Sequence, residues 1–266
     1  MGAGEAHITV RKLTMAYGSF VLMRELDFEV RRGSVFIIMG PSGCGKSTLL
    51  KYLIGLKDGD GAEIRYGDDP FTGIDADERR RMQRRFGILY QKGALFSSMT
   101  LAENVMLPLR EFTELSESDM RDVARLKLAL VGLKGFEDYY PSDISGGMQK
   151  RAGLARAMAL DPEVLFFDEP SAGLDPITSK LLDDLILELR DSLGATVVVV
   201  THELASIFAI GDDSIFLDPE KRTISARGHP RELLETCEDP KVQRFLRRGE
   251  DGGGPPGARR SDRKER

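Results

Sequence analysis

The sequence predicts an α/β fold built on a mainly parallel sheet, with a helical segment inserted into it. Residues 34–39 (SVFIIM) and 195–201 (ATVVVVT) form short apolar runs, and a third run, residues 163–170, ends in acidic side chains. Short length and β-branched or aromatic enrichment are typical of buried strands. Helical patterns separate these runs, over residues 46–54 and 179–193. Strands that alternate with helices form a parallel sheet covered on both faces.

The helical insertion is expected over about residues 97–160, where the strand pattern disappears. Thr100 and Glu103 have the spacing of a capping box and predict the start of one helix. Pro108 is expected to break or kink that helix, because proline lacks the backbone N–H. A second amphipathic helix is expected over residues 116–132. The sequence therefore predicts a helical subdomain inside the α/β core.

Composition limits the class of protein. The chain has 266 residues, of which 41% are hydrophobic and 30% charged, and it can bury a sizeable core. A net charge of -5 gives no electrostatic reason to expect nucleic acid as a partner. Two cysteines are too few for a disulfide framework. No apolar run approaches the roughly 18 residues that cross a bilayer. If the chain works at a membrane, we expect a partner to hold it there.

The domain boundary is expected near the C-terminus. Residues 1–248 carry the strand and helix patterns and are predicted to form one domain. Residues 249–266 are rich in glycine and proline and then in charge, which predicts a disordered tail.

A phosphate-binding loop is indicated by GPSGCGKST, which follows the first apolar strand and opens a helix. This is the G-x-x-x-x-G-K-[ST] pattern in the context that it requires, whereas a chance glycine-rich turn would lack the strand, the lysine or the helix. Lys46 is expected to reach the β- and γ-phosphates, and Ser47 to offer its hydroxyl to Mg²⁺. The candidate nucleotide-binding residues of this loop are Gly40, Pro41, Ser42, Gly43, Cys44, Gly45, Lys46, Ser47 and Thr48.

A second part of the site is indicated by VLFFDEP, where an apolar strand ends in two carboxylates. Asp168 is placed to join the magnesium shell, and Glu169 to orient or polarise an attacking water. The alternative is that this pair only caps the next helix. The phosphate loop upstream favours the catalytic interpretation.

A third part begins at Ser145, where SGGMQKRAGLARAMAL places a hydroxyl and two glycines before a strong helix former. A helix N-terminus attracts anions, and Gly146 and Gly147 allow close approach of a phosphate. By itself this pattern is weak, and a flexible helix cap would explain it equally well.

These motifs, together with Gln91, SAGLD and VTHE, occur in the order and spacing of the ATP-binding cassette (ABC) ATPases, and the chain resembles that family up to about residue 230. The resemblance implies a P-loop NTPase fold with an N-terminal antiparallel β portion. It also implies a head-to-tail homodimer that encloses two ATP molecules, in which residues 145–147 of one subunit close over the ATP of the other. Met148 departs from the family pattern, which has glutamine there, so a polar contact from that position to the sugar is not expected.

The resemblance also implies roles for single residues. Gln91 would sense the γ-phosphate and join Ser47 and Asp168 around Mg²⁺. His202 would hold the γ-phosphate and the water, so that the catalytic set is Glu169, His202, Lys46 and Gln91. Asp175 would link the two sites of the dimer, and Tyr17 would stack on adenine. Simpler alternatives are a solvated strand end for Gln91, core packing for Tyr17 and a structural role for His202.

A membrane partner is implied by the details of the resemblance. QKGALFSSMTLAENVMLPLRE and DPKVQRFLRRG are similar to the ATPases of Mce-type (Mla, phospholipid-trafficking) lipid transporters. This implies an integral membrane permease pair, an Mce-domain lipid-binding protein and, in some systems, a STAS-domain regulator. It places the chain at the cytoplasmic face of the bacterial inner membrane, held through the permease. Part of the apolar segment 95–112 would dock a permease helix, and about half of it would pack the core.

Three alternatives keep other functions open. The first is the ATPase of another ABC importer or of a lipoprotein-releasing system. The second is a soluble ABC ATPase of DNA repair or translation, which predicts tandem cassettes, a coiled-coil insertion or a basic surface. The third is a regulatory module that binds ATP without turnover. The combination of Lys46, Asp168, Glu169 and His202 argues against the third.

Overall fold

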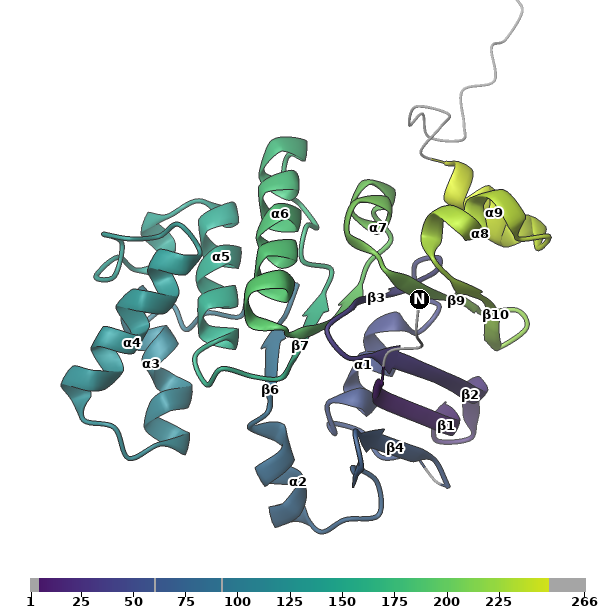
Figure 1. The fold of residues 1–266 in the computed structure, drawn as a ribbon, viewed down its shortest axis with the longest axis horizontal. Helices are drawn as coiled ribbons and strands as arrows, with labels where there is room; N and C mark the ends of the chain where they lie inside the picture. The colour runs from purple at the N-terminus through teal and green to yellow at the C-terminus, as the bar shows by residue number, and fades with distance from the viewer. Residues whose placement is uncertain (1–4, 60, 92, 249–266) are drawn as a thin grey trace, which may run out of the picture.

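The computed structural model describes residues 5–59, 61–91 and 93–248 as two sheets with helices around them (Figure 1). The tail expected over residues 249–266 lies outside the described residues. None of the helices within the described ranges is both long and apolar enough to cross a membrane.

The larger sheet has six strands in the order β10-β9-β3-β8-β7-β6, and only the β9–β10 pair is antiparallel. Every residue of β3 and β8 is buried, which explains their continuous apolar runs. The three strands expected from the sequence are confirmed as β3, β7 and β8. The strands are β3 (Val35–Met39), β6 (Phe86–Leu89), β7 (Val164–Asp168), β8 (Thr196–Val200), β9 (Asp213–Asp218) and β10 (Thr223–Gly228).

The smaller sheet is antiparallel, with the order β2-β1-β4-β5, and the implied N-terminal β portion is confirmed. Its strands alternate between buried and more exposed side chains, as expected when one face packs on a core. The strands are β1 (Ala6–Tyr17), β2 (Phe20–Arg31), β4 (Glu63–Tyr66) and β5 (Asp69–Pro70).

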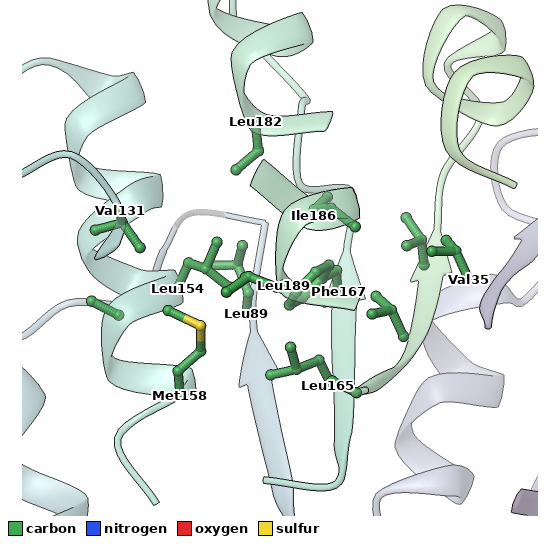
Figure 2. Packing of buried hydrophobic residues seen from close by; sticks show 14 of the residues in the cluster. Val35, Leu89, Val131, Leu154, Met158, Leu165, Phe167, Leu182, Ile186 and Leu189 are labelled. Carbon is green, nitrogen blue, oxygen red and sulfur yellow. The ribbon is translucent and has the colours of Figure 1, made fainter. Parts of the chain in front are cut away.

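The large sheet separates two apolar cores. Alternate residues of β3 face opposite sides, so that Ile37 packs into the core under the helices and Phe36 into the core shared with the small sheet. Figure 2 shows the first core, where Leu154 of α5 and Ile186 of α6 meet Phe167 of β7. The helices are α1 (Lys46–Leu53), α2 (Ala76–Gln83), α3 (Leu101–Phe112), α4 (Glu117–Leu130), α5 (Gly146–Ala157), α6 (Pro176–Leu193), α7 (Leu204–Ile210), α8 (Pro230–Thr236) and α9 (Pro240–Arg247), with a 3₁₀ turn at Pro141–Asp143.

The helices α3, α4 and α5 lie between β6 and β7 in the chain and pack beside the sheet (Figure 1). The capping box of Thr100 and Glu103 is confirmed at the start of α3. Of the two expected effects of Pro108, a break or a kink, the break is wrong, because α3 continues through Pro108 to Phe112. Val105 and Leu109 are buried on either side of Pro108, and this packing keeps the helix in place despite one missing hydrogen bond.

Candidate active site

The candidate site lies where four neighbouring parallel strands end. β3 leads into the glycine-rich loop, β6 into Gln91, β7 into Asp168 and Glu169, and β8 into His202. The carboxyl ends of parallel strands meet at one edge of a sheet, where α/β proteins place their ligands. A cleft of about 460 Å³ opens there. It is lined by Tyr17, Leu22, Ser42, Gly43, Gly45, Lys46, Ser47, Thr48, Gln91, Glu169 and His202.

The glycine-rich loop has a backbone that other residues do not readily adopt. Gly40 and Gly45 have φ angles of 147° and 107°. A Cβ at Gly40 would lie 2.8 Å from the carbonyl oxygen of Leu217, so the loop packs directly on β9. Gly40, Pro41 and Cys44 do not line the cleft. The Cys44 side chain is fully buried in the core, and burial raises the pKa of its thiol.

Lys46 is buried at the base of this loop. Its Nζ donates hydrogen bonds to the carbonyl oxygens of Gly40 at 3.0 Å and Pro41 at 3.2 Å. The same Nζ lies 3.9 Å from Oε1 of Glu169. A positive charge is therefore fixed between the loop and the carboxylate of Glu169, the residue that follows β7.

Ser47, which lines the cleft, forms an oxygen pair with Asp168, which does not line it. The Ser47 hydroxyl donates to Oδ1 of Asp168 at 2.8 Å. Burial raises the pKa of Asp168, and the hydrogen bond from Ser47 opposes this. A hydroxyl and one carboxylate suit Mg²⁺, which is usually held by one or two carboxylates together with substrate phosphates and water. The described residues contain no group of three or more His, Cys, Asp or Glu side chains that could hold a metal without such help.

Glu169 and His202 contact each other across the ends of β7 and β8. Nδ1 of His202 lies 2.8 Å from Oε1 of Glu169. Oε2 of Glu169 is buried and has no hydrogen-bond partner among the described residues. Glu169 also has a left-handed φ of 51°. For a residue other than glycine this costs about 1–2 kcal/mol, and such strain persists only where surrounding contacts hold it.

Tyr17 stands at the mouth of the cleft. Tyr17 is 49% exposed, so the alternative of core packing is wrong. The Tyr17 hydroxyl lies 3.0 Å from Oγ1 of Thr48, and Nζ of Lys57 lies 3.6 Å from the centroid of the ring. Lys57 was not predicted, because no local pattern relates it to Tyr17. Leu22 of β2 also lines the cleft and was not predicted. An apolar residue in a strand pattern gives no sign of a binding role.

The residues Ser145, Gly146, Gly147 and Asp175 do not line the cleft within one chain. Ser145 caps α5 by accepting from the backbone N–H of Met148, and Asp175 caps α6. The two helix starts are close together, since a Cβ at Gly147 would lie 2.6 Å from Cγ2 of Thr178. Gly147 is thus needed for helix packing, whereas the space around Gly146 is open.

A second, apolar cavity of about 490 Å³ lies beside β6 and α3. Some residues of the apolar segment 95–112 are buried in the core and others line this cavity. Leu101, Val105 and Leu109 are buried in the core, whereas Phe96, Leu107 and Phe112 line the cavity. The full lining is Gln83, Phe86, Gly87, Ile88, Tyr90, Phe96, Leu107, Pro108, Glu111, Phe112, Arg156, Ala157 and Leu160, which we call the α3 groove.

Comparisons with known proteins agree with this architecture. The family model for the ABC transporter matches residues 23–172. The chain is 41% identical over 239 residues to the probable ribonucleotide transport ATP-binding protein mkl of Mycobacterium tuberculosis, covering 90% of this chain and 66% of that protein. It is 38% identical over 248 residues to the intermembrane phospholipid transport system ATP-binding protein MlaF of Escherichia coli, covering 93% of this chain and 91% of that protein.

Solved structures show the same fold. A dimeric, post-hydrolysis structure of the ATP-binding cassette MJ0796 bound to ADP and Pi has a TM-score of 0.74 at 28% identity, covering 84% of this chain and 98% of that one. The structure of cbiO1 from Clostridium perfringens has a TM-score of 0.80 at 24% identity, covering 91% of this chain and 95% of that one, and supports the fold alone. The expected fold is confirmed, and the chain belongs to the ABC transporter family, as an ATP-hydrolysing ABC ATPase.

Proposed function

We propose that this chain is the ATP-hydrolysing subunit of an Mce-type transporter that moves phospholipid between the inner and outer membranes. The hydrolytic part rests on one observation, the Glu169–His202 pair that faces Lys46 in the cleft. The cargo rests on the likeness to MlaF proteins, which extends over more than 90% of their length.

The proposed chemistry follows from the positions of the side chains. Lys46 turns from the loop carbonyls to the β- and γ-phosphates of ATP. Ser47, Asp168 and Gln91 would hold Mg²⁺, which when bound neutralises phosphate charge. Tyr17 stacks on the adenine. These residues place the γ-phosphate beside the end of β7.

Glu169 acts as the base in this scheme. Because His202 occupies Oε1, Oε2 is the oxygen left to accept the proton of the attacking water. His202 keeps the carboxylate in this orientation and approaches the γ-phosphate. Gln91 reports the state of that phosphate to the neighbouring α3 groove.

A second copy of the chain completes the site in this proposal. Ser145, Gly146 and Gly147 lie away from their own cleft, so a head-to-tail homodimer would bring them to the ATP of the other copy. Asp175 would then lie between the two sites. The dimeric structures of the cassette MJ0796 support the formation of a homodimer.

The α3 groove is the proposed docking site for a permease helix. Its lining is mainly apolar, and it begins next to Tyr90 and hence next to Gln91. Through a permease pair the chain would be held at the cytoplasmic face of the bacterial inner membrane, with an Mce-domain protein and a STAS-domain regulator as further partners. Nucleic acid is not among the proposed partners.

Copurification tests the proposal. The tagged chain is expressed in its native host, the membranes are solubilised in mild detergent, and proteins and lipids are identified by mass spectrometry. We expect a multi-span permease, an Mce-domain protein and phospholipid. Recovery of a different permease, or of bound ribonucleotide as the name of the mycobacterial relatives suggests, would overturn the proposed phospholipid cargo. The assignment as an ATPase would stand. Recovery without any membrane partner would overturn the transporter proposal.

A further inference from the structure

Lys150 of α5 is a buried lysine without a carboxylate partner among the described residues. Only 7% of its surface is exposed. Its Nζ donates hydrogen bonds to the carbonyl oxygens of Pro170 at 2.6 Å and Ala172 at 2.5 Å. Burial lowers the pKa of Lys150, while the charges of Glu203 and Glu169 oppose this. A buried ammonium that is held by two carbonyl oxygens fixes those oxygens in turn.

Pro170 and Ala172 belong to the turn that begins at Glu169. Within the turn, the N–H of Ala172 donates to the carbonyl oxygen of Glu169 at 3.2 Å. Glu169 itself has the left-handed backbone described above, which neighbouring contacts must maintain. Among the described side chains, Lys150 alone donates hydrogen bonds to the carbonyl oxygens of Pro170 and Ala172.

We propose that Lys150 is a positioning residue for the hydrolytic reaction. By holding Pro170 and Ala172, it ties the helix that begins at Ser145 to the turn that carries Glu169, so that both move as one unit. When Ser145 contacts the ATP of a second copy, Lys150 would thereby fix Glu169, the base that serves the cleft of its own chain. This inference rests on the proposed function of Glu169.

The test compares three variants of the full-length chain. Lys150→Met removes the ammonium with its hydrogen bonds and keeps an unbranched side chain that is one atom shorter. Lys150→Gln keeps two N–H donors without the charge. Lys127→Met is the matched control, because Lys127 of α4 is also buried, 5% exposed, and pairs with Asp161 far from the turn. ATP affinity, turnover and melting temperature are measured for each.

We expect Lys150→Met to lower kcat by roughly 10²-fold, the effect of a small misplacement of reacting groups, with ATP affinity within about twofold of wild type. Lys150→Gln should recover part of kcat. Lys127→Met should keep wild-type kcat even if its melting temperature falls. Wild-type turnover in both Lys150 variants would overturn the inference, as would equal losses of kcat in Lys150→Met and Lys127→Met.

A second readout does not depend on turnover. The chain has only three histidines, so the ring signals of His202 and His229 are separable by NMR. Because His202 contacts Glu169, Lys150→Met or Lys150→Gln should move the His202 signal and leave that of His229 unchanged. An unmoved His202 signal in both would overturn the inference. If wild type did not hydrolyse ATP, the proposed function would fail, and the His202 signal would still decide whether Lys150 positions Glu169.

Discussion

His202 contacts one oxygen of the Glu169 carboxylate, and the other oxygen is left without a hydrogen-bond partner in the part of the chain that the structure describes. Oε1 lies 2.8 Å from Nδ1 of the histidine, and Oε2 is buried without a partner among the described residues. An unpaired buried oxygen is costly, so its persistence at this position is explained if it accepts a proton during the reaction.

Replacing Glu169 by glutamine should separate binding from turnover. The amide keeps the shape but cannot accept a proton, so kcat should fall by roughly 10²–10⁴-fold. ATP affinity should be close to wild type. Steady-state hydrolysis and calorimetry measure the two effects, with Glu235→Gln on the exposed side of α8 as control. Near-wild-type hydrolysis by Glu169→Gln would show that another group is the base.

Replacing Lys46 by alanine should weaken ATP binding itself. A hydrogen bond to a charged group contributes about 1.5–3 kcal/mol, which corresponds to roughly 10–10²-fold in affinity. Calorimetric titration with ATP and Mg²⁺ measures this. Lys51→Ala is the control, because Lys51 is exposed on the same helix, α1. Equal ATP affinities of wild type and Lys46→Ala would show that Lys46 does not bind the phosphates.

A charge in the α3 groove should disrupt membrane association and leave the cleft intact. Phe112→Asp places a carboxylate among apolar side chains, and burying it under a docked helix is unfavourable. The permease should then be lost from the copurified material while ATP affinity is unchanged. Leu126→Asp is the control, since Leu126 is 58% exposed on α4 and lies outside the groove lining. Undiminished permease recovery with Phe112→Asp would mean that docking occurs elsewhere.

Asp183 of α6 should make stability depend on pH. It is 5% exposed and accepts a hydrogen bond from Ser206 of α7 at 2.8 Å. Burial raises the pKa of Asp183 from 3.8 to about 6. The folded state therefore holds the proton more tightly than the unfolded state, so its free energy of unfolding falls as pH rises from about 4 to about 6.

The shift corresponds to about 2–3 kcal/mol lost by pH 7. Asp183→Asn should be more stable than wild type at pH 7 by up to this amount, with a smaller difference at pH 4.5. Urea unfolding at both pH values measures it. A stability difference that is the same at the two pH values would contradict the pKa of Asp183.

The sequence predicted those parts of the site that are contiguous in the chain. The glycine-rich loop, the two carboxylates at the end of β7 and the capping box of Thr100 depend on neighbours within a few residues. A break at Pro108 was predicted but does not occur, because packing on both sides of the proline outweighs the loss of one hydrogen bond. A prediction from neighbouring residues alone does not include the stabilisation that tertiary packing provides.

By itself, the sequence determined the buried strands β3, β7 and β8, several of the helices between them, and the residue types of the loops that follow these strands. Only the tertiary structure decided which of these loops touch. It placed His202 on Glu169, Lys57 over Tyr17 and Lys150 on the turn after Glu169, pairs that lie 33, 40 and 20 or more residues apart. Spacing in the chain carries no record of such contacts, because they arise only when separate strands, helices and loops pack against one another.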